Sequence, residues 1–152
     1  MKSVLISIRP EWCDLIARGE KTLEVRKTKP KIDTPFKCYI YCTKAPKGWF
    51  WFDSPNVRRD GAVIGEFICD TLVIDKTFGH DPLFNGAACM SEIKCAAYSN
   101  CSPIYGWHIS DLKIYEKSKK LSDFTRIKTM RDGFELRVLE RAPQSWCYVE
   151  EV

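Results

Sequence analysis

The sequence lacks most of the features that identify a familiar type of catalytic site. It contains only two histidines, His80 and His108, in unrelated contexts, and it has neither a glycine-rich phosphate loop nor a serine elbow. No apolar run approaches the roughly 20 residues that a membrane-spanning helix needs. The N-terminal apolar stretch is interrupted by Arg9, Pro10 and Glu11, which argues against a signal peptide. We therefore expect a cytoplasmic protein that has no membrane partner.

The eight cysteines contain no Cys-x-x-Cys pair and show no common spacing of zinc ligands. Cys38 and Cys42 are four residues apart, so in a strand they face the same side as small apolar residues. A disulfide framework is typical of exported proteins, and the sequence gives no indication of export. We therefore expect eight structural thiols, no bound metal and no cofactor.

Positive charge is unevenly distributed along the 152 residues, for which we expect a single domain over residues 1–152. The net charge is +4, yet residues 18–47 carry nine lysines and arginines against three acids, and residues 113–131 carry seven against two. If these two basic segments meet on one face, they form the positive surface expected of a nucleic-acid binder. Alternatively, the lysines lie in loops and only keep the protein soluble.

The most informative stretch begins with a helix and its end. Pro10 suits the first position of a helix, and the i, i+3, i+4 spacing of Trp12, Leu15 and Ile16 predicts a helix over residues 10–18. Gly19 suits the position after the helix C-terminus, because positive φ costs glycine little.

A polar-faced strand follows this turn. Leu23 and Val25 share one face of the extended segment, and polar side chains share the other: Thr22, Glu24 and Arg26. If the apolar face is buried, these side chains and Lys21 project from a rigid element into a cleft, where exposed positions tolerate substitution without loss of folding. The alternative is a solvated strand in which Glu24 forms a salt bridge with Lys21 or Arg26.

The remaining pattern predicts several short strands and one further helix. Strands are expected over residues 4–8, 37–43, 63–75, 109–116, 134–139 and 146–149, and a helix over 91–98, capped by Ser91. The segment 80–86 is expected to be a loop, and Gly65 to mark a bulge or a close backbone approach. Inward-facing side chains are expected at Cys38, Ile40, Cys42, Phe134, Leu136 and Val138, and outward-facing ones at Tyr39 and Tyr41. This arrangement favours a mostly antiparallel barrel of the α+β class.

Four consecutive aromatic residues, Trp49–Phe52, lie between segments rich in glycine and proline. Such a run can stack on nucleic-acid bases. It can equally pack over the end of a barrel.

The run Val4–Arg26, VLISIRPEWCDLIARGEKTLEVR, resembles the activating-signal-cointegrator homology (ASCH) domain. The family pattern Gly-x-Lys-x-x-Glu-x-Arg fits Gly19, Lys21, Glu24 and Arg26 without a gap. Residues 61–67 resemble the central strand of this domain, and residues 106–109 its tryptophan-containing segment. The resemblance implies a β-barrel similar to the PUA RNA-binding domain, with a short N-terminal helix and one or two further helices. It also implies that Lys21, Glu24 and Arg26 line the cleft.

Two classes of function follow from the residues and this resemblance. In the first, which we favour, the domain binds RNA or another single-stranded nucleic acid, or a nucleoside. Lys21 and Arg26 then hold a phosphate or a base edge, and Glu24 accepts a hydrogen bond from an exocyclic amine. The residues expected to contact the ligand are Lys21, Thr22, Glu24, Arg26, Arg9 and Lys27.

In the second class, the protein is a small amidohydrolase, similar to bacterial relatives that remove the acetyl group of N4-acetylcytidine. Lys21 and Glu24 are then the catalytic candidates, although Glu24 stands where those enzymes have threonine. Those enzymes also use a glutamate further along the chain; the sequence does not identify its counterpart here, and Glu66 and Glu92 are candidates. A carboxylate beside Lys21 favours its ammonium form, which is a poor base and a poor nucleophile.

Overall fold

The computed structural model describes residues 2–45 and 60–152 of the chain. In chain order, its elements are β1 (Lys2–Ile8), α1 (Pro10–Ala17), β2 (Leu23–Arg26), β3 (Phe36–Cys42), β4 (Ala62–Asp75), α2 (Pro82–Ala88), α3 (Glu92–Ser99), β5 (Ile104–Lys119), the 3-10 helix η1 (Leu121–Asp123), β6 (Thr125–Met130), β7 (Gly133–Val138) and β8 (Trp146–Glu150). Within the described ranges, no helix is long and apolar enough to cross a membrane. The Trp49–Phe52 run lies outside the described residues, so its role stays a prediction.

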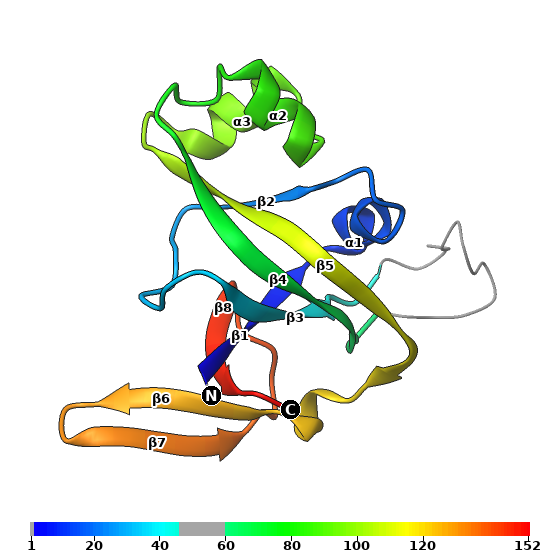
Figure 1. The fold of residues 1–152 in the computed structure, drawn as a ribbon, viewed down its shortest axis with the longest axis vertical. Helices are drawn as coiled ribbons and strands as arrows, with labels where there is room; N and C mark the ends of the chain where they lie inside the picture. The colour runs from blue at the N-terminus through cyan, green and yellow to red at the C-terminus, as the bar shows by residue number, and fades with distance from the viewer. Residues whose placement is uncertain (1, 46–59) are drawn as a thin grey trace. The chain divides into compact units, whose positions relative to one another are not determined.

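The strands form one sheet in the order β2-β5-β4-β3-β1-β8-β6-β7 (Figure 1). Strand β1 is parallel to β3 and antiparallel to β8, and the pairs β2–β5 and β6–β7 are antiparallel. A sheet of this kind with three helices belongs to the α+β class, as predicted. The strand order has two ends, β2 and β7, and closure of the sheet into a barrel stays a prediction.

The contacts divide the described chain into two units, which we treat separately. The first unit contains residues 2–14, 37–45, 60–67 and 112–152, and the second contains Leu15–Phe36 and Ile68–Asp111. Strands β4 and β5 contribute residues to both units. The expectation of a single domain over residues 1–152 stays a prediction.

The core of the first unit is built on β1 and β3. Residues 4–6 are fully buried, because a continuous apolar run suits a strand that is covered on both faces. The inward-facing side chains predicted for β3 are buried: Cys38, Ile40 and Cys42. Tyr39 and Tyr41 were predicted to face outward and are buried as well, so that prediction was wrong. The reason is that Phe124 covers this second face, with its ring edge-on to Tyr39 at a centroid distance of 4.9 Å.

Two backbone segments of the first unit approach each other closely at position 65, and this explains why the residue there is glycine. A Cβ atom at this position would lie 2.5 Å from the carbonyl oxygen of Lys113 and 3.2 Å from the Cα of Ile114. No side chain fits there, so the predicted close approach at Gly65 is confirmed.

Strand β7 departs from its predicted orientation. Phe134, Leu136 and Val138 were expected to face the core, yet they are 68%, 46% and 58% exposed. The alternation of apolar and charged residues predicted the strand correctly. It did not reveal that Phe134 and Leu136 line a hollow instead of a packed core.

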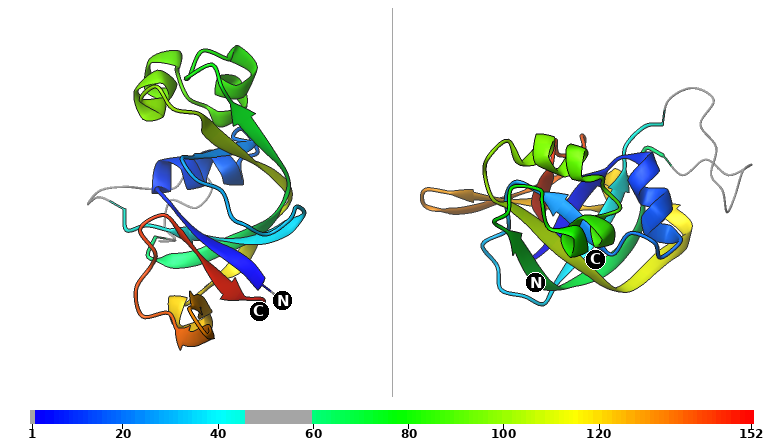
Figure 2. Two further views of the ribbon diagram at one scale, coloured as in Figure 1. Left: turned by 90° about the vertical axis from the view of Figure 1, so that its left-hand side faces the viewer. Right: turned by 90° about the horizontal axis from the view of Figure 1, so that it is seen from above.

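The second unit combines β2 with α2 and α3, which lie side by side (Figures 1 and 2). Its apolar cluster consists of Leu23, Val25, Phe84, Ala88 and Ile104. Helix α3 and its Ser91 cap were predicted, and Ser91 accepts a hydrogen bond from the backbone of Lys94. Helix α2 replaces the predicted loop over residues 80–86, which was therefore wrong. Asp81 caps this helix and Pro82 is its first residue. This start signal was missed because the nearby asparagine and glycine suggested a loop.

All eight cysteines lie in the described residues, and none of them forms a disulfide, as predicted. Burial raises the pKa of Cys69 to about 12 and the pKa of Cys147 to about 11. These two thiols therefore stay protonated at neutral pH and act as small apolar side chains.

Candidate functional site

The turn between α1 and β2 sets the position of the predicted site. Gly19 has φ of 77°, in the left-handed region that glycine enters without strain. Its N–H donates to the carbonyl of Ile16 at 3.0 Å. The N–H of Glu20 donates to the carbonyl of Leu15, also at 3.0 Å. These two bonds are the Schellman motif of a helix end, so the predicted glycine stop is confirmed and the chain is directed into Lys21.

The residues after this turn bind the C-terminal end of α2. The Lys21 Nζ atom donates a hydrogen bond of 2.6 Å to the carbonyl of Ala88. The backbone N–H of Thr22 donates to the carbonyl of Ala87 at 2.9 Å. The last carbonyls of a helix lack partners within it and carry its negative end, so a cation is stabilised there. Lys21 thus has a structural contact that the predicted loop over residues 80–86 could not reveal.

Glu24 lies between two cations and forms the ion pairs that were expected only for the alternative of a solvated strand. Its Oε1 atom accepts a hydrogen bond of 3.2 Å from the Arg26 Nε atom, and a guanidinium nitrogen of Arg26 lies 3.1 Å away. Its Oε2 atom lies 3.9 Å from the Lys21 Nζ atom. Leu23 and Val25 are buried on the opposite face, so the division of β2 into two faces is confirmed.

The burial of this pair differs from the expectation of an open polar face. Lys21 is 3% exposed and Glu24 is 5% exposed, so neither is a surface position that tolerates any substitution. Burial lowers the pKa of Lys21 below its ordinary value of 10.5, and the charge of Glu24 opposes this shift without cancelling it. The expectation that Glu24 favours the ammonium form of Lys21 is confirmed in direction, but desolvation is the larger effect, so the net shift of the pKa is downward.

The buried oxygen of Glu24 also changes its expected role. The Oε2 atom accepts no hydrogen bond from the described residues and is closed to solvent. A direct contact between Glu24 and a base stays a prediction. Its contact with Arg26 gives it a second role, because a carboxylate bound at Nε fixes the direction of the guanidinium group.

Two lysines beyond β2 lie over tyrosine rings of the second unit. The Lys27 Nζ atom lies 5.1 Å from the ring centre of Tyr98, and the Lys29 Nζ atom lies 5.8 Å from that of Tyr105. Tyr105 is directly opposite Arg26 in the pairing of β2 with β5, so the two side chains share a face. The lysines are exposed and the tyrosines are half-buried. We refer to Arg26, Lys27, Lys29, Tyr98 and Tyr105 as the Arg26 cluster.

Sequence reasoning predicted only part of the Arg26 cluster. Lys29 belongs to the basic segment 18–47, but nothing in the sequence singles it out from the other lysines there. Tyr98 and Tyr105 were missed, because their approach to β2 depends on the positions of α3 and β5. The spacing of residues along the chain carries no such information.

Trp107 anchors the segment that carries Lys27 and Lys29. Its Nε1 atom donates a hydrogen bond of 3.4 Å to the carbonyl of Thr28, and its ring meets that of Phe36 edge-on at 5.8 Å. Trp107 is fully buried, so one residue between the two lysines is held against the core. The backbone between the two lysines is therefore held at Thr28, while Lys27 and Lys29 themselves are exposed.

The other predicted residues have separate contacts. Arg9 is exposed and belongs to the first unit, so its place in the site stays a prediction. Glu66 accepts a hydrogen bond of 2.9 Å from the hydroxyl of Tyr115 within the first unit. Glu92 lies at the start of α3, with its Oε1 atom 2.8 Å from His80 Nδ1. Neither acid is shown beside Lys21.

The lowered pKa of Lys21 leads to a pH-dependent prediction. An unfolded lysine titrates near 10.5, whereas the folded chain releases this proton at a lower pH. Between the two values the unfolded state binds more protons, so the contribution of Lys21 to stability rises with pH. We expect the free energy of unfolding of the native protein to increase relative to that of Lys21→Met between neutral pH and pH 10.5. Urea unfolding of both proteins across this range measures the difference, and a constant difference would contradict the lowered pKa.

No family model matches the chain, and no curated protein matches it. Several solved structures, in contrast, match the chain. The crystal structure of ASCH from Zymomonas mobilis matches with a TM-score of 0.66 and 19% identity, over 98% of this chain and 88% of that chain. A mutant of the same protein matches with a TM-score of 0.68 and 19% identity, over 99% and 92% of the two chains. At this identity the likeness concerns the fold, which is the one that the Gly19–Arg26 motif predicted. The chain has the fold of an ASCH domain.

Proposed function

We propose that the Arg26 cluster binds single-stranded RNA. The observation that carries this proposal is the alternation of exposed cations and half-buried tyrosine rings beside the Glu24–Arg26 pair. Proteins that bind single strands combine positive charge for the phosphates with aromatic rings on which bases stack. The excess of positive charge in residues 18–47 supports the same conclusion.

Each member of the cluster has a distinct part in this proposal. Lys27 and Lys29 neutralise successive phosphates, because both ammonium groups lie on exposed residues. Tyr98 and Tyr105 offer ring faces to unstacked bases once Lys27 and Lys29 turn from these rings to the phosphates. Arg26 stacks on or hydrogen-bonds to a base edge, held in direction by Glu24. The second basic segment, residues 113–131, extends the binding surface if it lies on the same face.

Fluorescence anisotropy with a labelled single-stranded oligoribonucleotide tests the proposal. Affinity is expected to fall steeply as salt rises, since each neutralised phosphate releases counterions. The double variant Lys27→Gln/Lys29→Gln is expected to bind more weakly and to lower the salt slope by about 1.4, at about 0.7 for each phosphate of a single strand. Single-stranded DNA and duplex RNA of the same sequence distinguish the kind of nucleic acid.

The matched control is Lys76→Gln/Arg141→Gln, which removes the same charge from exposed residues outside both basic segments. It is expected to change affinity little and to keep the salt slope. Equal losses in the two double variants would mean that net charge alone attracts the strand. Absence of binding by the native protein at low salt would end the proposal.

The lowered pKa of Lys21 supports a second candidate function, the hydrolysis of N4-acetylcytidine or a similar acylated nucleoside. A lysine with a lowered pKa supplies more of its neutral amine, the form that acts as a base or a nucleophile. The variant Glu24→Thr introduces the hydroxyl found in the amidohydrolases of this resemblance, and it is expected to create or raise release of acetate from N4-acetylcytidine. No turnover by either the native protein or this variant would leave binding as the function.

A further inference from the structure

Strand β7 presents a row of exposed apolar side chains at one end of the sheet. Phe134, Leu136 and Val138 alternate along this strand and are 68%, 46% and 58% exposed. In the order of the described strands, β7 has β6 on one side and no strand on the other. A long, apolar and unpaired edge is a template for pairing with another chain.

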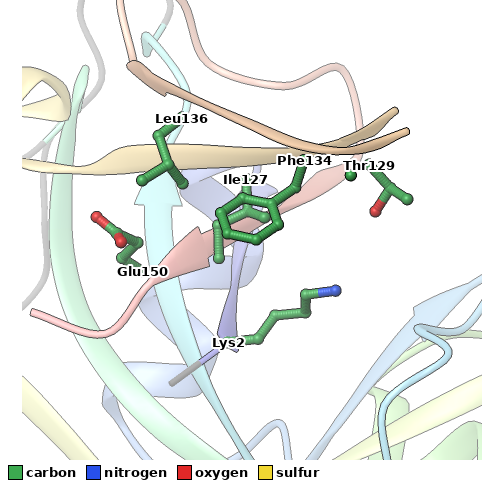
Figure 3. A pocket seen from close by; sticks show the side chains of 7 residues that line it. Lys2, Ile127, Thr129, Phe134, Leu136 and Glu150 are labelled. Atoms are coloured by element: carbon green, nitrogen blue, oxygen red, sulfur yellow. The ribbon is translucent and has the colours of Figure 1, made fainter. Parts of the chain in front are cut away.

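The apolar row belongs to a wider surface of the first unit. The same face contains a hollow of about 490 Å³ (Figure 3). Its lining residues are Lys2, Ile127, Thr129, Gly133, Phe134, Leu136 and Glu150. Single exposed apolar residues are ordinary, whereas a contiguous apolar surface of this kind marks an interaction site.

The charged residues of β7 identify the partner. Glu135 and Arg137 alternate with the apolar row, and each charge has the opposite sign to the next one along the strand. When two copies of this strand run antiparallel about an axis at Leu136, the Glu135 of each copy faces the Arg137 of the other. The same register places Phe134 opposite Val138, and Leu136 opposite itself. Both kinds of cross-strand pair are stabilising.

The pairing within the hairpin favours the same partner. Arg137 lies opposite Arg126 on β6, a like-charge pair that destabilises a sheet. Its Nε atom lies 2.6 Å from Glu135 Oε1 of its own strand, on a largely exposed side chain. A carboxylate arriving on the free side of β7 offsets this repulsion. Glu135, in contrast, lies opposite Lys128 on β6, so it has a cross-strand partner of opposite charge within its own hairpin.

We propose that the protein forms a two-fold symmetric dimer in which β7 pairs antiparallel with β7 of a second copy, centred on Leu136. The two adjacent symmetric registers are excluded by charge. An axis at Glu135 places this carboxylate opposite its own copy, and an axis at Arg137 places two guanidinium groups together. Of these three registers, the one centred on Leu136 makes every charged and apolar pair within residues 134–138 complementary, as an interface between identical surfaces requires.

A charge-exchange experiment tests both the dimer and its register. Sedimentation of the native protein over a wide range of concentrations is expected to show a monomer–dimer equilibrium. Glu135→Arg and Arg137→Glu each place like charges opposite one another twice per dimer, so each is expected to weaken association by about tenfold or more. The double variant E135R/R137E restores opposite charges and is expected to associate nearly as well as the native protein. Lys76→Glu, a charge reversal on the exposed surface of the second unit, is expected to leave association unchanged.

A mixture of the two single variants provides the decisive result, and circular dichroism first establishes that each variant is folded. One variant carries two positive side chains on β7 and the other carries two negative ones, so the mixture is expected to form a heterodimer at a concentration where each variant alone is monomeric. A native protein that stays monomeric at every concentration overturns the proposal. A native dimer that is unaffected by either single variant, or a mixture that does not associate, also overturns it.

Discussion

Replacing Lys21 by alanine is expected to lower the free energy of unfolding by about 3–5 kcal/mol at neutral pH, although lysine is commonly a surface residue. Its side chain is 2% exposed, donates to the carbonyl of Ala88 and lies 3.9 Å from Glu24. Removing it leaves the Glu24 carboxylate buried with less compensation, which costs more than the ion pair itself contributes. Denaturant unfolding of Lys21→Ala measures this loss.

The matched control is Lys27→Ala, which removes the same side chain from an exposed position six residues further on. It is expected to change stability by no more than about 0.5 kcal/mol. The pair Lys21→Met and Lys21→Met/Glu24→Gln completes the test, since the amide removes the stranded negative charge and keeps an oxygen that accepts from the Arg26 Nε atom. The double variant is expected to be more stable than Lys21→Met alone. A loss at Lys21 no larger than that at Lys27 would mean that the buried contact is not formed.

Leu23→Ala is expected to destabilise the protein by about 2–5 kcal/mol, because the cavity that it leaves can close only in part. Leu23 is buried in the cluster that also contains Phe84 and Ala88 of α2. Its methyl groups approach Gly106 so closely that a Cβ atom there would lie 3.1 Å from one of them. Thermal or denaturant unfolding gives the loss.

Leu83→Ala is the control for this cavity. Leu83 lies on α2, in the same unit, but is 86% exposed. The same substitution there is expected to lower the free energy of unfolding only slightly. A similar loss at both positions would show that the loss at Leu23 does not come from a cavity. Loss of RNA binding is expected in Leu23→Ala only to the extent that the protein unfolds.

Local rules predicted the features that depend on neighbouring residues. Gly19 ends α1 because the chain needs positive φ there, and the period of two along β2 separates Leu23 from Glu24. Such features are decided within a few residues, so the sequence is sufficient to predict them. The same is true of the Ser91 cap of α3.

Predictions of features that depend on distant segments were wrong, or the features were missed. Tyr39 is buried because Phe124, far along the chain, covers it, and Phe134 is exposed because its face of β7 lines a hollow instead of a packed core. The contact of Lys21 with α2 joins residues 67 positions apart. An alternating pattern tells which side chains share a face, but only the arrangement of the strands decides which face is covered.

Amide hydrogen exchange with and without a single-stranded oligoribonucleotide tests the central claim most directly, because it reports where the strand binds. The Arg26 cluster predicts slower exchange in the complex over residues 22–31 and 98–108, which contain its lysines, Arg26 and both tyrosines. Strand β7, which lies outside both basic segments, is expected to exchange at an unchanged rate at concentrations where the protein's own association is constant. Protection confined to the first unit, with none over residues 22–31, would contradict the account.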